Sequence, residues 1–328
     1  MPVTGPRPRW PCSSSSSTHW PAPQPEVGVG GAVGDDAPVP PPPLTVVVVH
    51  WNQSERCIRS LAQLERQDVE VRPLVVDNGS RPDQLAAVRA ALPPHGELLE
   101  LGANQGFGPA ANAGWRHWLA TDTGEWVALM PHDALPDDGA LAALLAIAAE
   151  RPRLGLLSAD VGDGATPVVD PYFGGITRPA SKSTGFEAAD HPHGTLMLAR
   201  RELLERVGLF DERYFAYCEE ADLGLRATAA GYKVGLARGV MVRNPEMGPG
   251  SPAVAYLQLR NTLLLVRERS GIYHATIRLL IALWQIGRSV VQPSVRDHLH
   301  HPVARLLGVV HFVTRRFGPP PTRLLPPG

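Results

Sequence analysis

The sequence has 328 residues, of which 44% are hydrophobic and 19% charged, and its formal net charge at pH 7 is −1. A chain of this length and composition can bury a large core, so it is neither fibrous nor wholly disordered, and its near-neutral charge argues against general nucleic-acid binding. The three cysteines show neither paired spacing nor a Cys-x-x-Cys motif, which fits a protein of the reducing cytoplasm. No run of about 18 apolar residues indicates a membrane span, and the N-terminus lacks the apolar core of a secretory signal.

Residues 1–43 are rich in proline, serine and glycine and contain few large apolar side chains. Such a composition cannot bury enough apolar surface to offset the entropy lost on folding, so we expect a disordered leader. Folded structure is expected to begin at Leu44, where the β-branched run LTVVVV is typical of a parallel strand covered on both faces.

Strands and helices alternate along the next hundred residues. After the first strand, Asn52 or Ser54 is placed to cap a helix. The segment VRPLVVDNGS predicts a second buried strand that ends at Asp77, and a helix is expected over about 82–92. A third strand at ELLELG, a glycine-rich loop NQGFGPAANAG that leads into a helix through Trp118, and a fourth strand at WVALM continue the series. This alternation indicates an α/β fold.

Polar side chains follow the carboxyl ends of these strands. In open parallel sheets ligands bind beyond these ends, because helix N-termini and unpaired amide groups converge there. We therefore expect one crevice to be lined by the strand-end residues His50, Trp51, Asn52, Asp77, Asn78, Asn104 and Asp133.

Three of these motifs also have simpler interpretations. Asp77 in DNGS can serve a turn, and Asp133 can cap the helix expected to begin near residues 137–138 instead of ligating a divalent cation. The GFGPAA motif at residues 106–111 superficially matches a dinucleotide fingerprint, which leaves an NAD-dependent oxidoreductase as an alternative. That motif follows the third strand, however, whereas a dinucleotide fold carries it after the first.

The segment VGLFDERYFAYCEEADLGLRATAAGY, residues 207–232, concentrates acids among aromatic side chains. Carboxylates held against aromatic surface lose water, which raises their pKa and suits them to proton abstraction. The alternative is a solvated acidic turn that leads into an amphipathic helix. The clustered acids are Asp211, Glu212, Glu219, Glu220 and Asp222.

Six pieces of the chain, in order, resemble a family 2 glycosyltransferase of the GT-A fold, close to the rhamnosyltransferase-like branch. They are VVVVHWNQ, LVVDNGS, NQGFGPAANAG, LMPHDA, HGTLMLARRELLERVGLFDERYFAYCEEADLGLRATAAGYKV and LQLRNTLLLVRE. The resemblance covers about residues 44–270 and is most specific over 193–234. It implies an α/β domain of the GT-A type with a mainly parallel central sheet flanked by helices, followed by a basic amphipathic helical tail over 271–328.

The resemblance implies transfer of a sugar, for example the deoxyhexose rhamnose, from a dTDP- or UDP-sugar to an acceptor hydroxyl with inversion at the anomeric carbon. Cell-surface glycan synthesis and natural-product glycosylation both remain open. So does a lipid-linked acceptor, with peripheral contact to the inner face of the cell membrane. By the family's motifs the donor would be held by His50, Asn52, Asp77, Asn104, Gly106, Phe107, Asn112 and Asp133.

The family's catalytic base is the aspartate of a Glu-Asp pair, and this chain has Glu219 and Glu220 in that place. Glu220 would be the base, with one extra methylene, and must come within about 2.6–3.2 Å of the attacking hydroxyl. His193, Glu219 and Asp222 are expected on the acceptor or phosphate side. Asp222 is also spaced to pair with Arg226 on one helix face.

The implied metal site departs from the family pattern. Members show Asp-x-Asp or Asn-Pro-Asp at the strand end, whereas this chain has Pro131, His132 and Asp133. Asp133 would bind Mg²⁺ or Mn²⁺ with one oxygen ligand fewer, because Pro131 replaces the first, and His132 could assist only with the softer Mn²⁺. These departures leave a catalytically impaired nucleotide-sugar-binding protein as an alternative.

Two further regions are informative in composition only. Residues 162–183 are predicted to be loop-rich and to shape acceptor choice. The apolar segment 274–292 is expected to be helical, either facing the core or lying at an anionic membrane surface with its arginines reaching the interface. From Tyr256 onward ten arginines stand against one glutamate and one aspartate. We favour membrane-surface contact, because each basic residue near such a surface adds about 1 kcal/mol.

Overall fold

The computed structural model of the chain describes residues 42–244, 250–295 and 300–325. The predicted leader lies outside the described residues except for its last two, and the first strand begins at Leu44 as the β-branched run predicts. In chain order the elements are β1 (Leu44–His50), α1 (Ser54–Leu64), β2 (Val71–Asp77), α2 (Pro82–Ala91), β3 (Glu97–Glu100), α3 (Phe107–Thr121), β4 (Trp126–Pro131), β5 (Leu135–Pro136), α4 (Ala140–Ala149), β6 (Leu154–Asp160), β7 (Ala165–Asp170), β8 (Gly174–Pro179), β9 (Gly185–Ala188), β10 (Met197–Arg200), α5 (Arg201–Val207), the 3₁₀ turn η1 (Glu212–Tyr214), α6 (Glu219–Ala229), β11 (Lys233–Arg243), α7 (Pro252–Val291), η2 (Pro293–Val295), α8 (Pro302–Val313) and η3 (Thr322–Leu324).

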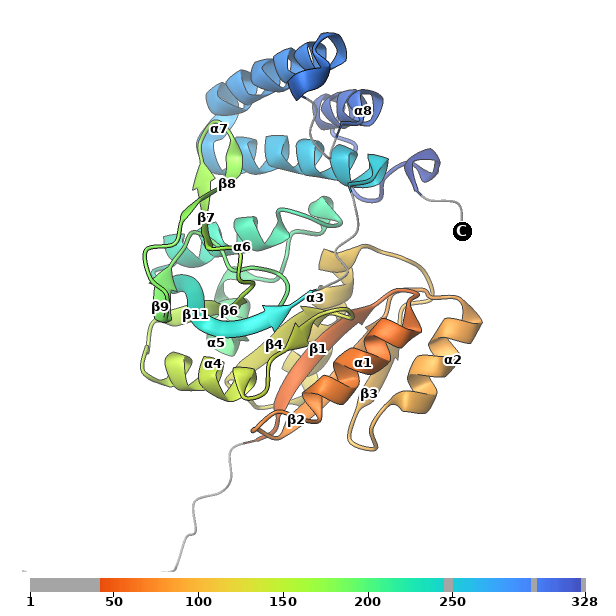
Figure 1. Cartoon of the computed structure of the whole chain (residues 1–328), viewed down its shortest axis with the longest axis vertical. Coiled ribbons are helices and arrows are strands. Elements are labelled where there is room, and N and C mark those ends of the chain that lie inside the picture. The colour runs from red at the N-terminus through yellow and green to blue at the C-terminus, as the bar shows by residue number, and fades with distance from the viewer. Residues whose placement is uncertain (1–41, 245–249, 296–299, 326–328) are drawn as a thin grey trace, which may run out of the picture. The chain divides into compact units, whose positions relative to one another are not determined.

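A mixed, mainly parallel sheet forms the centre of the α/β domain (Figure 1). Its strand order is β3-β2-β1-β4-β10-β6-β11-β5, and β9 pairs with β11. The first four strands of this order are parallel, whereas β10 runs antiparallel between β4 and β6. All seven residues of β1 are buried, as expected for a strand covered on both faces.

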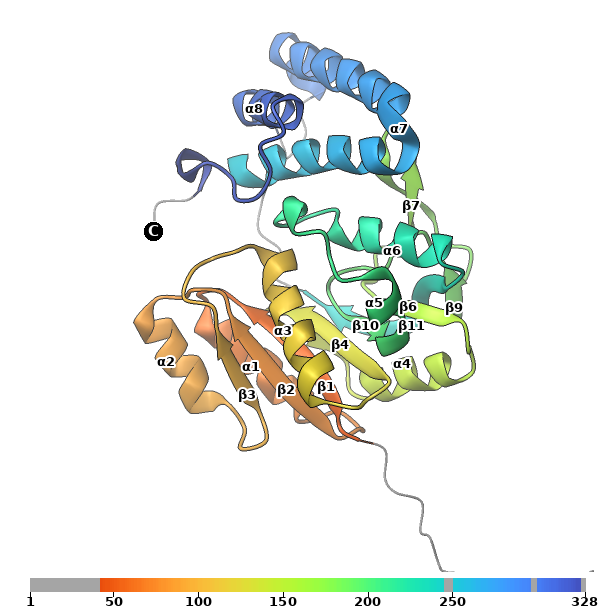
Figure 2. The same ribbon diagram turned by 180° about the vertical axis from the view of Figure 1, so that it is seen from behind.

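Helices cover both faces of this sheet. Helices α1, α2 and α4 pack their apolar side chains on one face, and α3, α5 and α6 pack on the other. Figures 1 and 2 show these two layers from opposite sides. The largest side chains of the second layer, Trp115 and Trp118 of α3, are fully buried. Every loop that follows a parallel strand therefore emerges at the same edge between the two layers.

Two helix starts differ from the sequence-based expectations. Neither Asn52 nor Ser54 caps α1. The residue before the helix is Gln53, in a left-handed conformation with φ 60° and no side-chain cap, and the amide of Ser54 donates to Oε1 of Gln84 at 2.9 Å. Helix α4 begins at Ala140 after Gly139, slightly later than expected, and Leu135 and Pro136 before it pair with β11 as the short strand β5.

The region predicted to be loop-rich, residues 162–183, contains an antiparallel hairpin. Strands β7 and β8 pair over their whole length, and β8 leaves five of its six residues exposed. Because so few of these side chains enter a core, the sequence carries no alternating apolar pattern that would reveal the hairpin. In Figure 1 it extends from the sheet toward α7.

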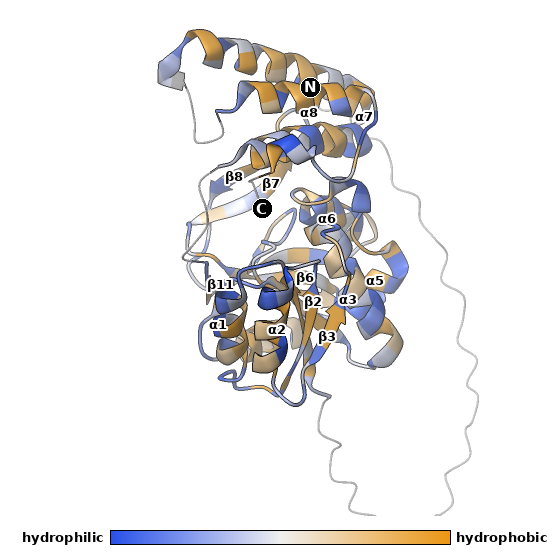
Figure 3. Cartoon of the chain, turned by 90° about the vertical axis from the view of Figure 1, so that its right-hand side faces the viewer, coloured by the Kyte–Doolittle hydropathy of each residue, from blue (hydrophilic) through white to orange (hydrophobic). Residues whose placement is uncertain are grey.

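The C-terminal region is helical, as predicted. Helix α7 is interrupted at Gly271, whose φ of 87° is non-helical, and this break lies at the boundary expected between domain and tail. Beyond it, Ala275, Ala282 and Ile286 are buried with α8, so part of this helix faces a core. Large apolar side chains are also exposed on both helices, and in Figure 3 the ribbons of α7 and α8 carry long orange stretches of hydrophobic residues. The exposed side chains include Ile272, Tyr273, Leu280, Trp284, Val303 and Val313. In the ranges that the structure describes, no helix is long and apolar enough to cross a bilayer.

Candidate active site

The carboxyl ends of β1, β2 and β4 meet at one edge of the sheet. The strand registers pair His50 with Asp77 and Val49 with Pro131. Nδ1 of His50 lies 3.0 Å from Oδ1 of Asp77, and both side chains are buried. The other carboxylate oxygen of Asp77 accepts hydrogen bonds from the amides of Gly79 and Ser80. Asp77 thus makes the contacts expected of a turn residue and also contacts His50.

The pKa of Asp77 is lowered, so this carboxylate is ionised at neutral pH. Burial opposes ionisation, but hydrogen bonds from His50 and Ser80 outweigh it. Since an ionised carboxylate can only accept, Nδ1 of His50 carries the proton that it donates. Asn52 contacts the turn that follows Asp77. Its backbone amide donates to Oγ of Ser80 at 2.8 Å, and its Oδ1 accepts from the backbone amide of Arg81 at 3.0 Å.

The end of β4 supplies His132 and Asp133. The backbone amide and Nδ1 of His132 both lie near the carbonyl oxygen of Val49, at 3.0 and 3.2 Å. Because a carbonyl can only accept, Nδ1 carries the proton and the lone pair is on Nε2, which is buried without a hydrogen-bond partner among the described residues. Burial lowers the pKa of His132, so the ring is neutral. The carboxylate of Asp133 is 19% exposed, and its Oδ2 is 3.9 Å from Nη1 of Arg56.

These residues fit a divalent cation only in part. Across the described residues no group of three His, Cys, Asp or Glu side chains could hold a metal ion. Asp133 offers one carboxylate, and the preceding residue, His132, offers the lone pair of an Nε2 that has no hydrogen-bond partner in the described ranges. Magnesium sites commonly use one or two carboxylates together with substrate phosphates and water. This set therefore suits an ion that arrives with a phosphorylated ligand better than a permanently bound ion.

The glycine-rich loop before α3 packs against the acidic segment. The side chain of Asn78 bridges to Oδ1 of Asn104 at 3.2 Å and to the carbonyl of Gly106 at 3.1 Å. Gly106 has φ 102°, and a Cβ at this position would overlap the carbonyl oxygen of Phe215. Only glycine allows both the positive φ and the close approach of Phe215. This requirement explains the first glycine of the motif that superficially matched a dinucleotide fingerprint. Phe107 follows it as the first residue of α3.

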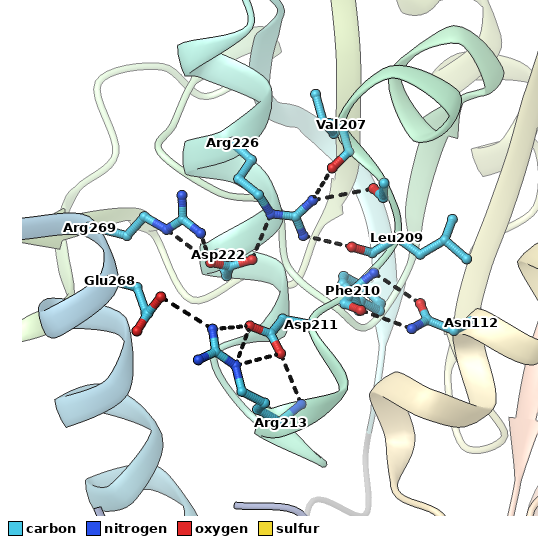
Figure 4. Close-up of polar contacts among 11 residues, drawn as sticks. Asn112, Val207, Leu209, Phe210, Asp211, Arg213, Asp222, Arg226, Glu268 and Arg269 are labelled. Carbon is cyan, nitrogen blue, oxygen red and sulfur yellow. Dashed lines mark hydrogen bonds and ion pairs between the residues drawn. The ribbon is translucent and has the colours of Figure 1, made fainter. Parts of the chain in front are cut away.

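Asn112 does not face the strand ends. Its Nδ2 donates to the carbonyl of Phe210 at 2.9 Å and to Glu212 at 3.1 Å, and its Oδ1 accepts from the amide of Phe210 at 3.0 Å. With its amide group fully used and its side chain 1% exposed, it holds the acidic segment against α3 (Figure 4). The expectation that Asn112 contacts the donor does not agree with this geometry.

The two glutamates occupy the first turn of α6. Glu219 is 2% exposed, and its Oε2 has no hydrogen-bond partner in the described part of the chain. Burial raises the pKa of Glu219 well above its usual value, and the charge of Glu220 raises it further. Burial also raises the pKa of Glu220. Two adjacent carboxyls in such surroundings cannot both ionise easily, and the deeper one, Glu219, keeps its proton.

The carboxylate of Glu220 lies against the backbone of Gly194. A Cβ on Gly194 would overlap Oε1 of Glu220 and would come within 3.1 Å of its Cδ. Gly194 precedes β10, whose Met197 pairs with Leu129 in β4, so the antiparallel register carries Gly194 to the carboxyl end of β4. Glu220 therefore lies at the same edge as Asp77 and Asp133.

His193 lies beside Gly194 and is half-buried. Its backbone amide donates to Oγ of Ser158 in β6 at 2.9 Å, and its Nε2 has no partner among the described residues. Burial lowers the pKa of His193, so its ring is neutral. Its ring is thus not a permanent positive charge that could hold a phosphate.

Asp222 forms a structural clamp between α6 and α7 (Figure 4). Its Oδ2 accepts from Nε of Arg226 at 2.7 Å, which confirms the predicted pair on one helix face, and its Oδ1 accepts from Nε of Arg269 at 2.9 Å. The carboxylate is 1% exposed. Asp222 therefore joins α6 to α7, and its expected place on the acceptor or phosphate side does not agree with these contacts.

Sequence reasoning missed how α7 holds the acidic segment. Nδ2 of Asn261 donates to the carbonyls of Tyr214, Ala216 and Tyr217. Three non-glycine residues in this segment, Phe215, Tyr217 and Cys218, have φ between 68° and 76°, a strained conformation that persists only where surrounding contacts enforce it. The motif LQLRNTLLLVRE contains Asn261, but its partners are backbone groups more than forty residues away.

Comparison with known proteins identifies the family. Residues 45–208 match the model of "Glycosyl transferase family 2". The N-acetylglucosaminyl-diphospho-decaprenol L-rhamnosyltransferase of Mycobacterium tuberculosis is 29% identical over 293 residues, which are 78% of this chain and 92% of that protein.

Among solved structures, the mannosyltransferase PcManGT of Pyrobaculum calidifontis, in complex with GDP-Man and Mn²⁺, is similar with a TM-score of 0.54 and 18% identity, over 84% of this chain and 87% of the other. GalNAc-T7 with UDP, GalNAc and Mn²⁺ also has a TM-score of 0.54, with 14% identity, over 69% of this chain and 47% of the other. These likenesses show the GT-A fold and do not extend to ligands. The oxidoreductase alternative has no support, and the chain belongs to glycosyl transferase family 2, as its motifs predict.

Proposed function

We propose that this glycosyltransferase moves a deoxyhexose such as rhamnose from a dTDP- or UDP-sugar to a hydroxyl of a lipid-linked acceptor, with inversion. The observation that carries the proposal is the carboxylate of Glu220, packed against Gly194 at the sheet edge that also holds Asp77 and Asp133. The relative whose name states L-rhamnosyl transfer to a diphospho-decaprenol acceptor matches 78% of this chain and supports the choice of donor and acceptor.

In the proposed reaction Glu220 takes the proton of the acceptor hydroxyl. The hydroxyl oxygen then forms a bond to the anomeric carbon as the bond from that carbon to the diphosphate oxygen breaks on the opposite face, and the nucleoside diphosphate leaves. A base with a raised pKa suits this step, because a general base works best when its pKa approaches the working pH. Glu219 stays protonated, so Glu220 carries the negative charge of the pair.

The donor would lie along the strand ends. His50, Asn52 and Asp77 would hold the nucleoside, and the loop from Asn104 to Phe107 would close around it. A surface cavity of about 690 Å³, lined by residues of the first turns of α1 and by Gln84, opens beside Arg56. This volume lies in the range of about 300–1,000 Å³ typical of ligand sites, and Arg56 is placed to attract the diphosphate.

A divalent cation would be held by Asp133 and by Nε2 of His132, with the donor phosphates completing its coordination. Such an ion neutralises the negative charge that develops on the leaving diphosphate. We propose Mn²⁺ over Mg²⁺, since an imidazole nitrogen is a better ligand for Mn²⁺ than for Mg²⁺.

A lipid-linked acceptor would bring the enzyme to a membrane surface. The exposed apolar side chains of α7 and α8, among them Ile272, Trp284 and Val313, would enter the interface. The excess of arginine after Tyr256 would add electrostatic attraction to anionic lipids. We therefore propose peripheral contact through this region.

The test compares wild type with Glu220→Gln in sugar transfer and in donor binding. Removing the base should lower the transfer rate by about 10²- to 10⁴-fold, with the Kd for the donor unchanged. Glu150→Gln, which alters an exposed glutamate directly after α4, is the control. Full transfer by Glu220→Gln would contradict the proposed base. Donor binding without transfer by the wild-type protein would identify an impaired binding protein instead.

The donor and the cation are identified by thermal shift. Nucleotide sugars with dTDP, UDP and GDP are screened with and without Mn²⁺, because a ligand that binds only the folded state raises the Tm. A dTDP- or UDP-deoxyhexose should give the largest shift, and Mn²⁺ should increase it. A larger shift with a GDP-sugar would contradict the proposed donor.

A further inference from the structure

A small cavity lies between the β7–β8 hairpin and the C-terminal helices. Its volume is about 190 Å³, too small for a nucleotide sugar when ligand sites typically measure about 300–1,000 Å³. The hairpin forms one wall, and α7 and α8 form the others. The residues that matter for its chemistry are Phe173, Gln258, Thr262, Arg278 and Arg305.

Arg278 is a buried cation, and two of its three guanidinium nitrogens are buried without a partner among the described residues. The residue is 8% exposed, and its Nε and Nη1 have no hydrogen-bond partner among the described residues. Burial and then the charge of Arg305 lower the pKa of Arg278 to about 10, so the guanidinium group of Arg278 remains charged at neutral pH. No acidic side chain in the described ranges forms an ion pair with Arg278. Buried charged donors are costly unless an acceptor meets them, which points to an anion supplied from outside the chain.

The cavity adjoins the segment that carries the candidate base. Oγ1 of Thr262, one of its lining residues, lies 3.9 Å from Sγ of Cys218. Cys218 directly precedes Glu219 and Glu220 in the chain. An anion bound beside Thr262 would therefore lie next to the start of α6, and the molecule that carries it could extend toward Glu220.

The surroundings also suit a ligand with a hydrocarbon part. Phe173, on the hairpin wall, is 47% exposed. On α7, Ile272 and Tyr273 are 68% and 65% exposed, a few residues before Arg278 in the chain. Arginine binds phosphate oxygens through paired hydrogen bonds, so two arginines that line one small cavity suit a phosphate. An anionic phosphate that is joined to a lipid offers both parts.

We propose that Arg278 and Arg305 form an anion site for the diphosphate of a lipid-linked acceptor. The identity of the acceptor rests on the proposed function, whereas the binding of an anion does not. The site would fix the acceptor by its diphosphate and leave the sugar hydroxyl to reach Glu220. Arg278 and Arg305 are thus acceptor-binding residues and take no part in the bond changes.

The test uses the full-length enzyme and two acceptors that share one sugar, a short-chain prenyl-diphosphate N-acetylglucosamine and an alkyl N-acetylglucosaminide. Losing one charge-assisted contact should raise the KM for the diphosphate acceptor by about 10- to 100-fold in Arg278→Gln and in Arg305→Gln. The KM values for the alkyl glycoside and the donor should not change. Arg278→Lys should recover part of the loss, and Arg267→Gln, on the same helix but outside the cavity, should behave as wild type.

A binding readout separates this proposal from the proposed function. Inorganic diphosphate, added without divalent cation, should raise the Tm of wild type and not that of Arg278→Gln. Arg278→Gln alone should keep or raise the Tm, because it removes an unpaired buried charge, whereas a purely structural arginine would lower it. In one outcome the enzyme transfers sugar to no prenyl-diphosphate acceptor while diphosphate still raises the Tm of wild type and not that of Arg278→Gln. In that case the anion site stands and the proposed acceptor fails.

Two outcomes would overturn the proposal. One is an unchanged KM for the diphosphate acceptor together with equal diphosphate stabilisation of wild type and Arg278→Gln. The other is weaker binding of Arg278→Gln to phosphatidylglycerol vesicles with an unchanged KM for the diphosphate acceptor. That result would assign the site to phospholipid headgroups and remove the acceptor from it.

Discussion

Replacing Gly194 by alanine tests whether the position of Glu220 matters, without removing its carboxylate. The new Cβ would overlap Oε1 of Glu220, while Cδ and Cγ at 3.1 and 3.4 Å would be tight but tolerable. The carboxylate oxygen must therefore move aside. Restoring an ordinary carbon–oxygen separation takes a displacement of about 1 Å, and a misplacement of that size in a reacting group costs about 10²-fold in rate.

The expected result is a fall in kcat of about 100-fold, which is about 2.7 kcal/mol of transition-state stabilisation. Stability should change little, because the clash is with the end of a flexible side chain and the backbone of Gly194 is not in the left-handed region. Alanine also restricts the unfolded chain, which adds about 0.4–1 kcal/mol of stability and offsets part of the clash. The measurements are transfer kinetics, the donor Kd and the Tm.

Two further variants sharpen this test. Gly287→Ala places a Cβ in open space on α7 and should leave kcat unchanged. Glu220→Asp shortens the side chain, so it should be less harmful in the Gly194→Ala background than in wild type, a non-additivity expected of residues in contact. A Gly194→Ala enzyme with kcat within about twofold of wild type would refute the reasoning, since a displaced base cannot keep the full rate.

The remaining predictions concern pH, stability and the cation. Transfer should fall as pH drops through a pKa above the usual value of 4.5 for a glutamate, because burial raises the pKa of Glu220; a pH–rate profile with its acidic limb at or below 4.5 would contradict this. Glu187→Gln should cost about 3 kcal/mol by urea denaturation, because it removes the carboxylate charge 2.7 Å from Nε of the buried Arg238 and leaves that arginine with Asp160 as its only ion-pair partner in the described ranges, and a loss below 1 kcal/mol would contradict it. Burial would raise the pKa of Glu187, but hydrogen bonds from Ser181 and Arg238 outweigh it and lower the pKa to about 2; the stability this gives is present above pH 4.5 and should be lost as pH falls toward 2. Pro131→Asp should lower the Mn²⁺ concentration needed for half-maximal activity, because it adds an oxygen ligand two residues before Asp133, and an unchanged Mn²⁺ titration would count against the proposed cation site.

The fold was predictable where burial leaves a periodic or continuous apolar pattern. The run at β1 and the segment VRPLVVD at β2 are buried on both faces, and both strands are where the sequence predicts them. The hairpin of β7 and β8 could not be found in this way, since its outer strand is almost wholly exposed. The start of α1 was missed for another reason. Gln53 adopts a left-handed conformation that its residue type does not favour, and the amide of the next residue, Ser54, is held by Gln84, thirty residues away in the chain.

The site was predictable where topology alone determines it. His50 and Asp77 end β1 and β2, and Asp133 lies two residues after the end of β4 in the same parallel set, so a shared edge follows from the order of the strands. The roles of Asn112 and Asp222 were not predictable, because they depend on partners such as Phe210 and Arg269 that lie about 100 and 47 residues away. The sequence of a motif does not show whether the oxygens of its carboxylates and amides are free to bind a ligand or already accept hydrogen bonds within the protein.

The replacement of the usual aspartate by Glu220 has a local physical account. Both glutamates begin α6, where the helix dipole favours one negative charge, yet burial raises the pKa of each and Glu219 has no hydrogen-bond partner for its Oε2 in the described residues. The proton is therefore retained on Glu219, and the charge rests on Glu220. Gly194 leaves space for the longer side chain at the sheet edge. The extra methylene and the missing Cβ at position 194 thus compensate each other, and a change at either position should be felt at the other.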